Sequence, residues 1–254
     1  MSHDCLIAFG SNLGDSDDCY RQIKESFQSD QRFAKVLASP AITTKPIGGS
    51  NEQSNYRNGC FRTSFTGSFE ELFKIIFEIE EKFGRLRRKR WDARTVDLDL
   101  LLFDDVVNDS QSLKIPHPRM TFRRFVLDPA VTIAGDMVHP VSGLTIAEHL
   151  ELLDQRPDRI VIATQEPAKL AEVIGKRISQ YESAGWQIQL ISNAAEILSD
   201  QEQIKLLVFS RELAKDFLAK IRPFKGATLD TSFLNDVESG WSELEAAIDA
   251  MTSL

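Results

Sequence analysis

Two aspartates and a cluster of basic side chains lie close together in residues 85–103, RLRRKRWDARTVDLDLLLF. Six of the first ten residues of this stretch are basic, in a chain whose net charge is −8. Asp97 and Asp99 follow inside an apolar run that predicts a half-buried strand. Side chains of a strand alternate between its faces, so both carboxylates are expected on the same side. The residues expected on the other side are Val96, Leu98, Leu100 and Leu102.

Two carboxylates side by side in a strand repel each other and disfavour the strand itself. A divalent cation between Asp97 and Asp99 removes this cost, because hard oxygen ligands are what Mg²⁺ prefers. The neighbouring arginines would then hold phosphate groups that the metal ion bridges. Residues 85–103 therefore indicate a nucleoside-triphosphate site.

Two further segments carry candidate binding residues. Tyr56 and Asn58 offer an aromatic face and an amide with both donor and acceptor, which suits a flat heterocycle. A structural Tyr and a turn-forming Asn would give the same pattern. His117 lies between Pro116 and Pro118, which hold it in an extended backbone. A lone His is more often structural than functional. Three arginines follow His117, however, and make it a candidate for phosphate or nucleotide contact. They are Arg119, Arg123 and Arg124.

These residues need a scaffold of alternating strands and helices. A strand is expected at Cys5–Phe9, a helix at Asp15–Phe27 and a second helix at Ser68–Phe83, where Ser68 and Glu71 predict a capping box. A long loop is expected from Ile42 to Gly59, whose last residues, from Tyr56, alternate as on entering a strand. A turn is expected at Asp104–Ser112, followed by a further helix or strand from Phe122 and a short helix ending near Leu150.

Composition limits the class of protein. The chain has 254 residues, 42% hydrophobic and 27% charged, which is typical of a globular protein of one large or two modest domains. A sequence pI of 5.1 argues against general nucleic-acid binding. The N-terminal sequence has no signal-peptide pattern and no apolar run reaches membrane-span length, so we expect no membrane contact. Cys5, Cys19 and Cys60 lack metal-ligand spacing and suit free thiols in the cytoplasm.

The candidate segments together resemble the 6-hydroxymethyl-7,8-dihydropterin pyrophosphokinase family of folate biosynthesis. The similar stretches are FGSNLGD (9–15), TKPIGG (44–49), YRNG (56–59), GRLRRKRWDARTVDLDLLLF (84–103), IPHPRM (115–120) and RRFVLDP (123–129). The resemblance covers about residues 4–152, and the block that ends in Asp97 and Asp99 is its most specific part. It implies a ferredoxin-like α+β fold, a three-layer sandwich with a mostly antiparallel sheet, in a domain of residues 1–153. It also implies transfer of pyrophosphate from ATP to the pterin hydroxymethyl group with release of AMP.

The resemblance also implies roles for individual residues. Asp97 and Asp99 would hold two Mg²⁺ ions, and Arg85 and Arg94 would stabilise the transferred charge. The residues implied in ATP binding are Glu80, Arg87, Trp91, Lys114, His117 and Arg123. The residues implied in pterin binding are Thr44, Pro46, Ile47, Tyr56, Asn58 and Phe125.

The last hundred residues lie outside this resemblance. DQRPDR (154–159) reads as a linker, and the following segments alternate apolar strands with helices, which predicts a small α/β domain with a parallel sheet over residues 158–254. No phosphate-binding loop follows its first strand. Two roles remain open: a second enzyme of the same pathway, or an interaction domain through which the chain self-associates.

Two alternatives to the pyrophosphokinase reading also remain. The N-terminal domain could be a ferredoxin-like nucleic-acid-binding domain that uses its arginines on RNA. That reading predicts a basic domain with aromatic residues on an exposed sheet face, whereas this chain is acidic. The other alternative is a pseudo-enzyme that keeps only the fold.

Overall fold

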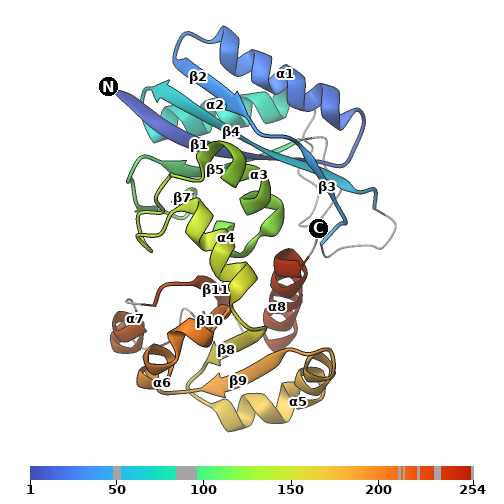
Figure 1. Ribbon diagram of the computed structural model, residues 1–254, viewed down its shortest axis with the longest axis vertical. Helices are drawn as coiled ribbons and strands as arrows, with labels where there is room; N and C mark the ends of the chain where they lie inside the picture. The colour runs from blue at the N-terminus through green and yellow to red at the C-terminus, as the bar shows by residue number, and fades with distance from the viewer. Residues whose placement is uncertain are drawn as a thin grey trace.

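The computed structural model describes residues 1–47, 53–83, 96–210, 213, 215–221, 224–231 and 236–252. Two sheets with their helices follow one another along the long axis of the molecule (Figure 1). The first sheet is formed by the N-terminal part of the chain and the second by the C-terminal part. Within the described residues, no helix combines the length and the apolar character that crossing a membrane requires.

The N-terminal sheet is antiparallel, with strand order β2-β4-β1-β5 and with β3 paired to β4. Its strands are β1 (Ser2–Ser11), β2 (Phe33–Ala38), β3 (Ile42–Thr44), β4 (Tyr56–Thr66) and β5 (Asp97–Phe103). The loop expected from Ile42 is wrong at its start, because β3 pairs in register with the first residues of β4. The strand expected from Tyr56 is confirmed.

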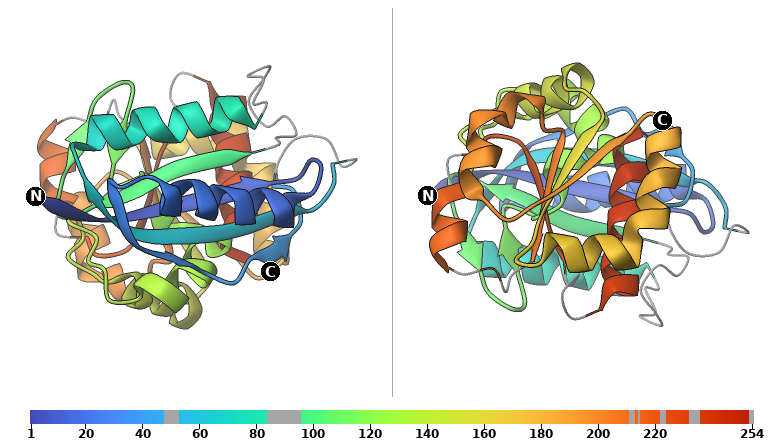
Figure 2. Two further views of the ribbon diagram at one scale, coloured as in Figure 1. Left: turned by 90° about the horizontal axis from the view of Figure 1, so that it is seen from above. Right: turned by 90° about the horizontal axis from the view of Figure 1, so that it is seen from below.

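Helices α1 (Ser16–Ser29) and α2 (Phe69–Lys82) lie side by side across one face of this sheet (Figure 2, left). Asp15 caps α1 by accepting a hydrogen bond from the Asp18 backbone N–H at 2.9 Å. The predicted capping box of Ser68 and Glu71 starts α2. The helices bury apolar stripes on the sheet, including Ile23, Phe27, Leu72 and Ile76. This face is therefore closed by a hydrophobic core.

Strand β5 follows the predicted alternation only in its first half. Leu98 and Leu100 pack into the core beneath α1 and α2, as expected. Leu102 packs into the core of the opposite face, so its predicted orientation is wrong. The cause is a bulge: Ile7 of β1 pairs with Leu100, but its neighbour Leu6 pairs with Leu102. The extra residue shifts the alternation by one position.

The opposite face of the sheet is covered by a second set of helices. They are η1 (Met120–Phe122), α3 (Arg124–Ala134) and α4 (Ile146–Gln155). Helix α3 packs on β4 and β1, and α4 packs on α3. The turn expected at residues 104–112 contains β6 (Asn108–Asp109), which pairs with β7 (Lys114–Ile115), just after it, in a small hairpin. Helices on both faces of an antiparallel sheet confirm the predicted three-layer α+β sandwich.

The C-terminal sheet is parallel, as predicted, and its strand order is β11-β10-β8-β9. Its strands are β8 (Arg159–Ala163), β9 (Gln187–Ile191), β10 (Leu206–Ser210) and β11 (Ala227–Thr231). Its helices are α5 (Pro167–Ser183), α6 (Ala194–Ser199), α7 (Lys215–Ile221) and α8 (Val237–Thr252), with η2 (Gln201–Gln203) between α6 and β10. Buried side chains of α5 and α8 pack on one face of the sheet, and those of α6 and α7 on the other.

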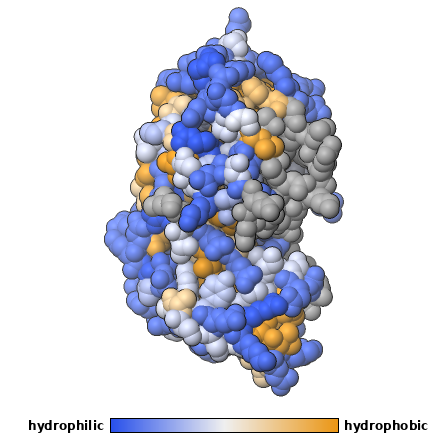
Figure 3. Space-filling view, turned by 90° about the vertical axis from the view of Figure 1, so that its right-hand side faces the viewer, coloured by the Kyte–Doolittle hydropathy of each residue, from blue (hydrophilic) through white to orange (hydrophobic). Residues whose placement is uncertain are grey.

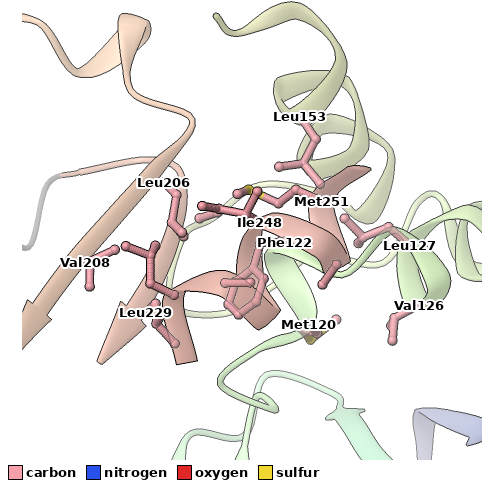
Figure 4. Close-up of a cluster of buried hydrophobic side chains, with 14 of the residues drawn as sticks. Met120, Phe122, Val126, Leu127, Leu153, Leu206, Val208, Leu229, Ile248 and Met251 are labelled. Carbon is pink, nitrogen blue, oxygen red and sulfur yellow. The ribbon is translucent and has the colours of Figure 1, made fainter. Parts of the chain in front are cut away.

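One hydrophobic core joins the two sheets. Met120, Phe122 and Leu127, which precede or begin α3, belong to the same buried cluster as Leu206 of β10 and Ile248 of α8 (Figure 4). The predicted linker is also held in place: Arg156 is 8% exposed and donates hydrogen bonds to the carbonyls of Ile204 and Lys225, both at 2.7 Å. A boundary near residues 153–158 remains a prediction.

Figure 3 shows one long face of the molecule, mostly hydrophilic, with apolar residues in small separate groups. Cys5, Cys19 and Cys60 are free, as their spacing predicted, and all three are buried. Burial raises the pKa of the Cys19 thiol to about 11, which keeps it protonated at neutral pH. These three cysteines are therefore small core residues.

Candidate active site

A cavity of about 350 Å³ lies where the end of β1 meets the beginnings of β4 and β5. It is on the face of the sheet that α3 covers. The antiparallel pairing brings these three strand ends together, and residues 117–126 form the remaining wall. The cavity thus collects side chains from segments far apart in the sequence.

Asp97 and Asp99 both line this cavity, from alternate positions of β5. Their partners across β1 are small: Gly10 lies opposite Asp97 and Ala8 lies opposite Asp99. These partners leave space around the two carboxylates. The side chain of Asp99 is 40% exposed, so it remains accessible to a ligand.

The two carboxylates fit a Mg²⁺ ion, because they provide hard oxygen ligands on one side of a strand. In the part of the chain that the structure describes, no three His, Cys, Asp or Glu side chains form a metal-ligand group. Phosphate and water oxygens can supply the further ligands of a Mg²⁺ ion that two carboxylates hold. This is how Mg²⁺ is usually bound in sites that handle nucleotides.

His117 reaches the same cavity beside the carboxylates. Its Nε2 lies 3.9 Å from Asp99 Oδ2, and its Nδ1 accepts a hydrogen bond from the Arg119 backbone N–H at 3.2 Å. Desolvation, together with the nearby charges of Arg123 and Arg119, lowers the pKa of His117 to about 3. The ring is therefore neutral at physiological pH, with its proton on Nε2, facing Asp99.

The arginines after His117 separate into two groups. Arg119 and Arg123 line the cavity and give it positive charge. Arg124 does not line it: its guanidinium pairs with Asp154, and with Asp128 at 3.3 Å. The structure therefore supports a phosphate-binding role for two of the three arginines, and a structural role for Arg124.

The other end of the cavity is suited to a flat ring. Tyr56, Asn58 and Phe125 line it together with Thr44 and Ile47. The Asn58 amide donates a hydrogen bond to Thr44 Oγ1 at 2.8 Å, and both residues are at most 5% exposed. This bond fixes the orientation of the amide. The guanidinium carbon of Arg123 lies 5.5 Å from the centroid of the Phe125 ring, which links the ring end to the charged end.

Three predicted site residues do not line the cavity. Glu80 is 3% exposed, and its Oε1 accepts a hydrogen bond from the Leu98 backbone N–H at 2.8 Å, so it anchors β5 between the two aspartates. Lys114 Nζ lies 2.7 Å from Asp109 Oδ1 in the β6–β7 hairpin. Pro46 lies between two lining residues but is not one itself.

Four predicted site residues lie outside the described residues. They are Arg85, Arg87, Trp91 and Arg94. Their assignments to transferred charge and to ATP remain predictions.

The cavity also includes residues that the sequence did not assign to a site. Gly10 and Lys45 are two of them. Lys45 stands inside the TKPIGG stretch and Gly10 inside FGSNLGD, so the stretches that carry the resemblance were the available signal. Arg119 had been grouped with two other arginines, and only the fold separates them.

Comparison with known proteins agrees with this geometry. The family model described as 7,8-dihydro-6-hydroxymethylpterin-pyrophosphokinase matches residues 6–135. The matched segment ends at the close of α3 and so contains the whole cavity.

Three curated relatives are named 2-amino-4-hydroxy-6-hydroxymethyldihydropteridine pyrophosphokinase. The protein of Synechocystis sp. is 44% identical over 102 residues, which are 40% of this chain and 52% of that protein. The Bacillus subtilis protein is 34% identical over 52% of this chain and 79% of its own length. The Pseudomonas aeruginosa protein is 33% identical over 53% of this chain and 82% of its own length.

Proposed function

The chain belongs to the 7,8-dihydro-6-hydroxymethylpterin-pyrophosphokinase family, and we propose that it transfers pyrophosphate from ATP to 6-hydroxymethyl-7,8-dihydropterin in folate biosynthesis. The observation that carries the proposal is a single cavity with an aromatic and amide slot at one end and two carboxylates with arginines at the other. A site for a flat acceptor is thus continuous with a site for a metal-bound triphosphate.

The acceptor occupies the slot between Tyr56 and Phe125. Aromatic side chains bind a flat ring through its faces, and an oriented amide reads the hydrogen-bonding edge of the ring. The hydrogen bond to Thr44 already orients the Asn58 amide. Its second N–H and its oxygen can therefore bind the ring without any rearrangement of the side chain. A ring that lacked matching groups would leave the buried amide unpaired, and this gives specificity.

The triphosphate lies at the charged end of the cavity. Asp97 and Asp99 would hold Mg²⁺, with two ions as the resemblance implies, and bound Mg²⁺ would neutralise charge on the phosphate oxygens. Arg119 and Arg123, which line the same cavity, supply positive charge. Arg85 and Arg94 are proposed to add charge where it develops during transfer, and an arginine in that role is worth roughly 10³-fold in rate.

The reaction joins the two ends of the cavity. The hydroxymethyl oxygen of the pterin attacks the β-phosphorus of ATP, and the bond from this phosphorus to the α–β bridging oxygen breaks. The hydroxyl proton passes to water, AMP carries away the bridging oxygen, and the pterin receives the diphosphate. In such transfers positioning and charge stabilisation supply most of the acceleration, which is what the described side chains provide.

The C-terminal α/β part is proposed to serve this enzyme rather than to catalyse a separate reaction. It shares one hydrophobic core with the segment that carries His117 and Phe125. Self-association through it and a cytoplasmic location remain predictions.

Product analysis tests the proposed function. The full chain is incubated with Mg-ATP with and without 6-hydroxymethyl-7,8-dihydropterin, and the nucleotide formed is identified. Pterin-dependent AMP supports pyrophosphate transfer, whereas ADP indicates an ordinary kinase. Absence of any pterin-dependent nucleotide, together with tight binding of RNA, would favour the nucleic-acid-binding alternative.

A further inference from the structure

The last helix of the chain reaches the cavity from the C-terminal side. Helix α8 packs on β11 and also on η1 and α3 of the N-terminal part (Figure 1). Glu243, near the middle of α8, places its Oε1 3.4 Å from Nη2 of Arg119. Glu243 thus pairs with a cavity arginine that lies more than 120 residues earlier in the chain.

This ion pair is largely removed from water. The Arg119 side chain is 20% exposed and the Glu243 side chain is 14% exposed. A small space of about 30 Å³ beside the pair is lined by Arg119, Phe125 and three alanines of α8, Ala246, Ala247 and Ala250. The small side chains let α8 approach closely, so the back of the cavity wall is formed by the C-terminal part.

The rest of the cavity wall depends on the same contact. Met120 and Phe122, two of the three residues between Arg119 and Arg123, are at most 2% exposed and belong to the core that includes Ile248 of α8 (Figure 4). The segment that carries the cavity residues is thus enclosed between the N-terminal sheet and α8. Its backbone is fixed by burial, and the long Arg119 side chain is fixed by its ion pair.

We propose that Glu243 is a positioning residue that holds the Arg119 guanidinium against the cavity for contact with the phosphates of ATP. An arginine has several rotatable bonds, and ordering them at the moment of binding costs free energy. A carboxylate that orders them beforehand removes part of this cost, and so increases affinity for the nucleotide. This inference rests on the proposed function, because it assumes a nucleotide in the cavity.

A mutant cycle on the full chain tests this role. The dissociation constant of the Mg complex of α,β-methylene-ATP, which cannot undergo the transfer, is measured by calorimetry. The variants are Glu243→Gln, Arg119→Ala and the double variant. Glu243→Gln should weaken binding about fivefold to tenfold, in the range of coupling between linked sites. In the Arg119→Ala background the same substitution should change binding by less than about twofold, because Glu243 acts through Arg119.

Steady-state kinetics separates positioning from a general structural effect. Glu243→Gln should raise KM for Mg-ATP and leave kcat and the pterin KM within about twofold of wild type. The matched control is Glu238→Gln on the same helix, because Glu238 pairs with Arg177 at 2.7 Å but is 76% exposed and does not line the cavity. This control should match wild type, and thermal melting should show that all variants are folded.

The outcomes distinguish this inference from the proposed function. Unchanged nucleotide affinity in Glu243→Gln, or an equal loss with and without Arg119, overturns the positioning role even if the wild type releases AMP. A wild type that binds the analogue but releases no AMP contradicts the proposed function, while the cycle still measures the coupling. A wild type that does not bind the analogue overturns both.

Discussion

Asn58 and Asp97 lie on either side of Gly10, each paired in register with it across β1. A Cβ atom at Gly10 would lie 3.4 Å from Asn58 Oδ1 and 4.0 Å from Asp97 Cβ. The amide proposed for the acceptor and the carboxylate proposed for the metal ion are therefore separated by one residue without a side chain. This spacing allows the two substrates to meet.

Filling that space should impair transfer more than folding. A strand accepts β-branched residues, so Gly10→Val is compatible with β1, but its methyl groups would project between Asn58 and Asp97. We expect kcat/KM to fall by about tenfold or more, which corresponds to a loss of about 1.4 kcal/mol or more in transition-state stabilisation. Steady-state kinetics and thermal melting measure the two effects. A variant with wild-type kcat/KM would show that the space beside Gly10 is not used.

Removing either carboxylate should abolish turnover. Asp97→Asn and Asp99→Asn keep the size of the side chain but remove a charged metal ligand, and we expect kcat to fall by roughly 10³-fold or more. Melting temperatures should be unchanged or higher, because the repulsion between the two acids is relieved. Asp105→Asn, an exposed acid after the end of β5, serves as the control and should be active. Near-normal turnover in either test variant would refute the proposed metal pair.

Asn58 should control affinity for the acceptor. In Asn58→Ala the pterin loses its amide partner and Thr44 loses the hydrogen bond to its Oγ1. A buried group left without its partner costs about 1–3 kcal/mol, so the pterin KM should rise by about tenfold to a hundredfold. The KM for Mg-ATP should change little. An increase confined to the ATP KM would place the acceptor elsewhere.

A buried histidine pair should make the fold sensitive to acid. Burial lowers the pKa of His139 to about 4, and burial together with His139 lowers the pKa of His149 to about 4. Both rings are neutral in the folded chain, and Ser142 Oγ lies 2.8 Å from His149 Nε2. The unfolded chain binds protons first as pH falls below an unperturbed pKa near 6.5, so folding stability is complete above that value and is lost towards pH 4.

The pH dependence can be measured by denaturant unfolding between pH 7 and pH 4. Each histidine should contribute a loss of about 1 kcal/mol per pH unit within this window. In a His139→Gln/His149→Gln variant this part of the slope should disappear, whatever its stability at pH 7. An unchanged slope would show that other groups cause the acid sensitivity.

Local patterns predicted the elements that carry the site. The capping box at Ser68 and the alternation around Asp97 specify structure through neighbouring residues, and both were confirmed where the structure describes them. The face of Leu102 was predicted wrongly because a bulge adds a residue without any local signal. The strand β3 was missed because three residues at a sheet edge are too few to show a period.

Long-range relationships were beyond such patterns. Arg119 and Arg124 are equivalent in the sequence, and their difference arises from the start of α3 at Arg124, which turns that side chain towards Asp128 and Asp154. The resemblance implies that Glu80 binds ATP, but the fold buries Glu80 against β5, where it accepts a hydrogen bond from the Leu98 backbone. The contact of Glu243 with the cavity depends on how two sheets pack, which no local pattern contains.

The most direct test of the account follows the atoms of the transfer. Pterin labelled with ¹⁸O in its hydroxymethyl group is incubated with Mg-ATP and the full chain, and the products are analysed by mass spectrometry and ³¹P NMR. The account predicts a pterin diphosphate that retains ¹⁸O in its carbon–oxygen–phosphorus bridge, together with unlabelled AMP. A pterin monophosphate formed with ADP, or ¹⁸O in the nucleotide, would contradict attack of the hydroxymethyl oxygen on the β-phosphorus.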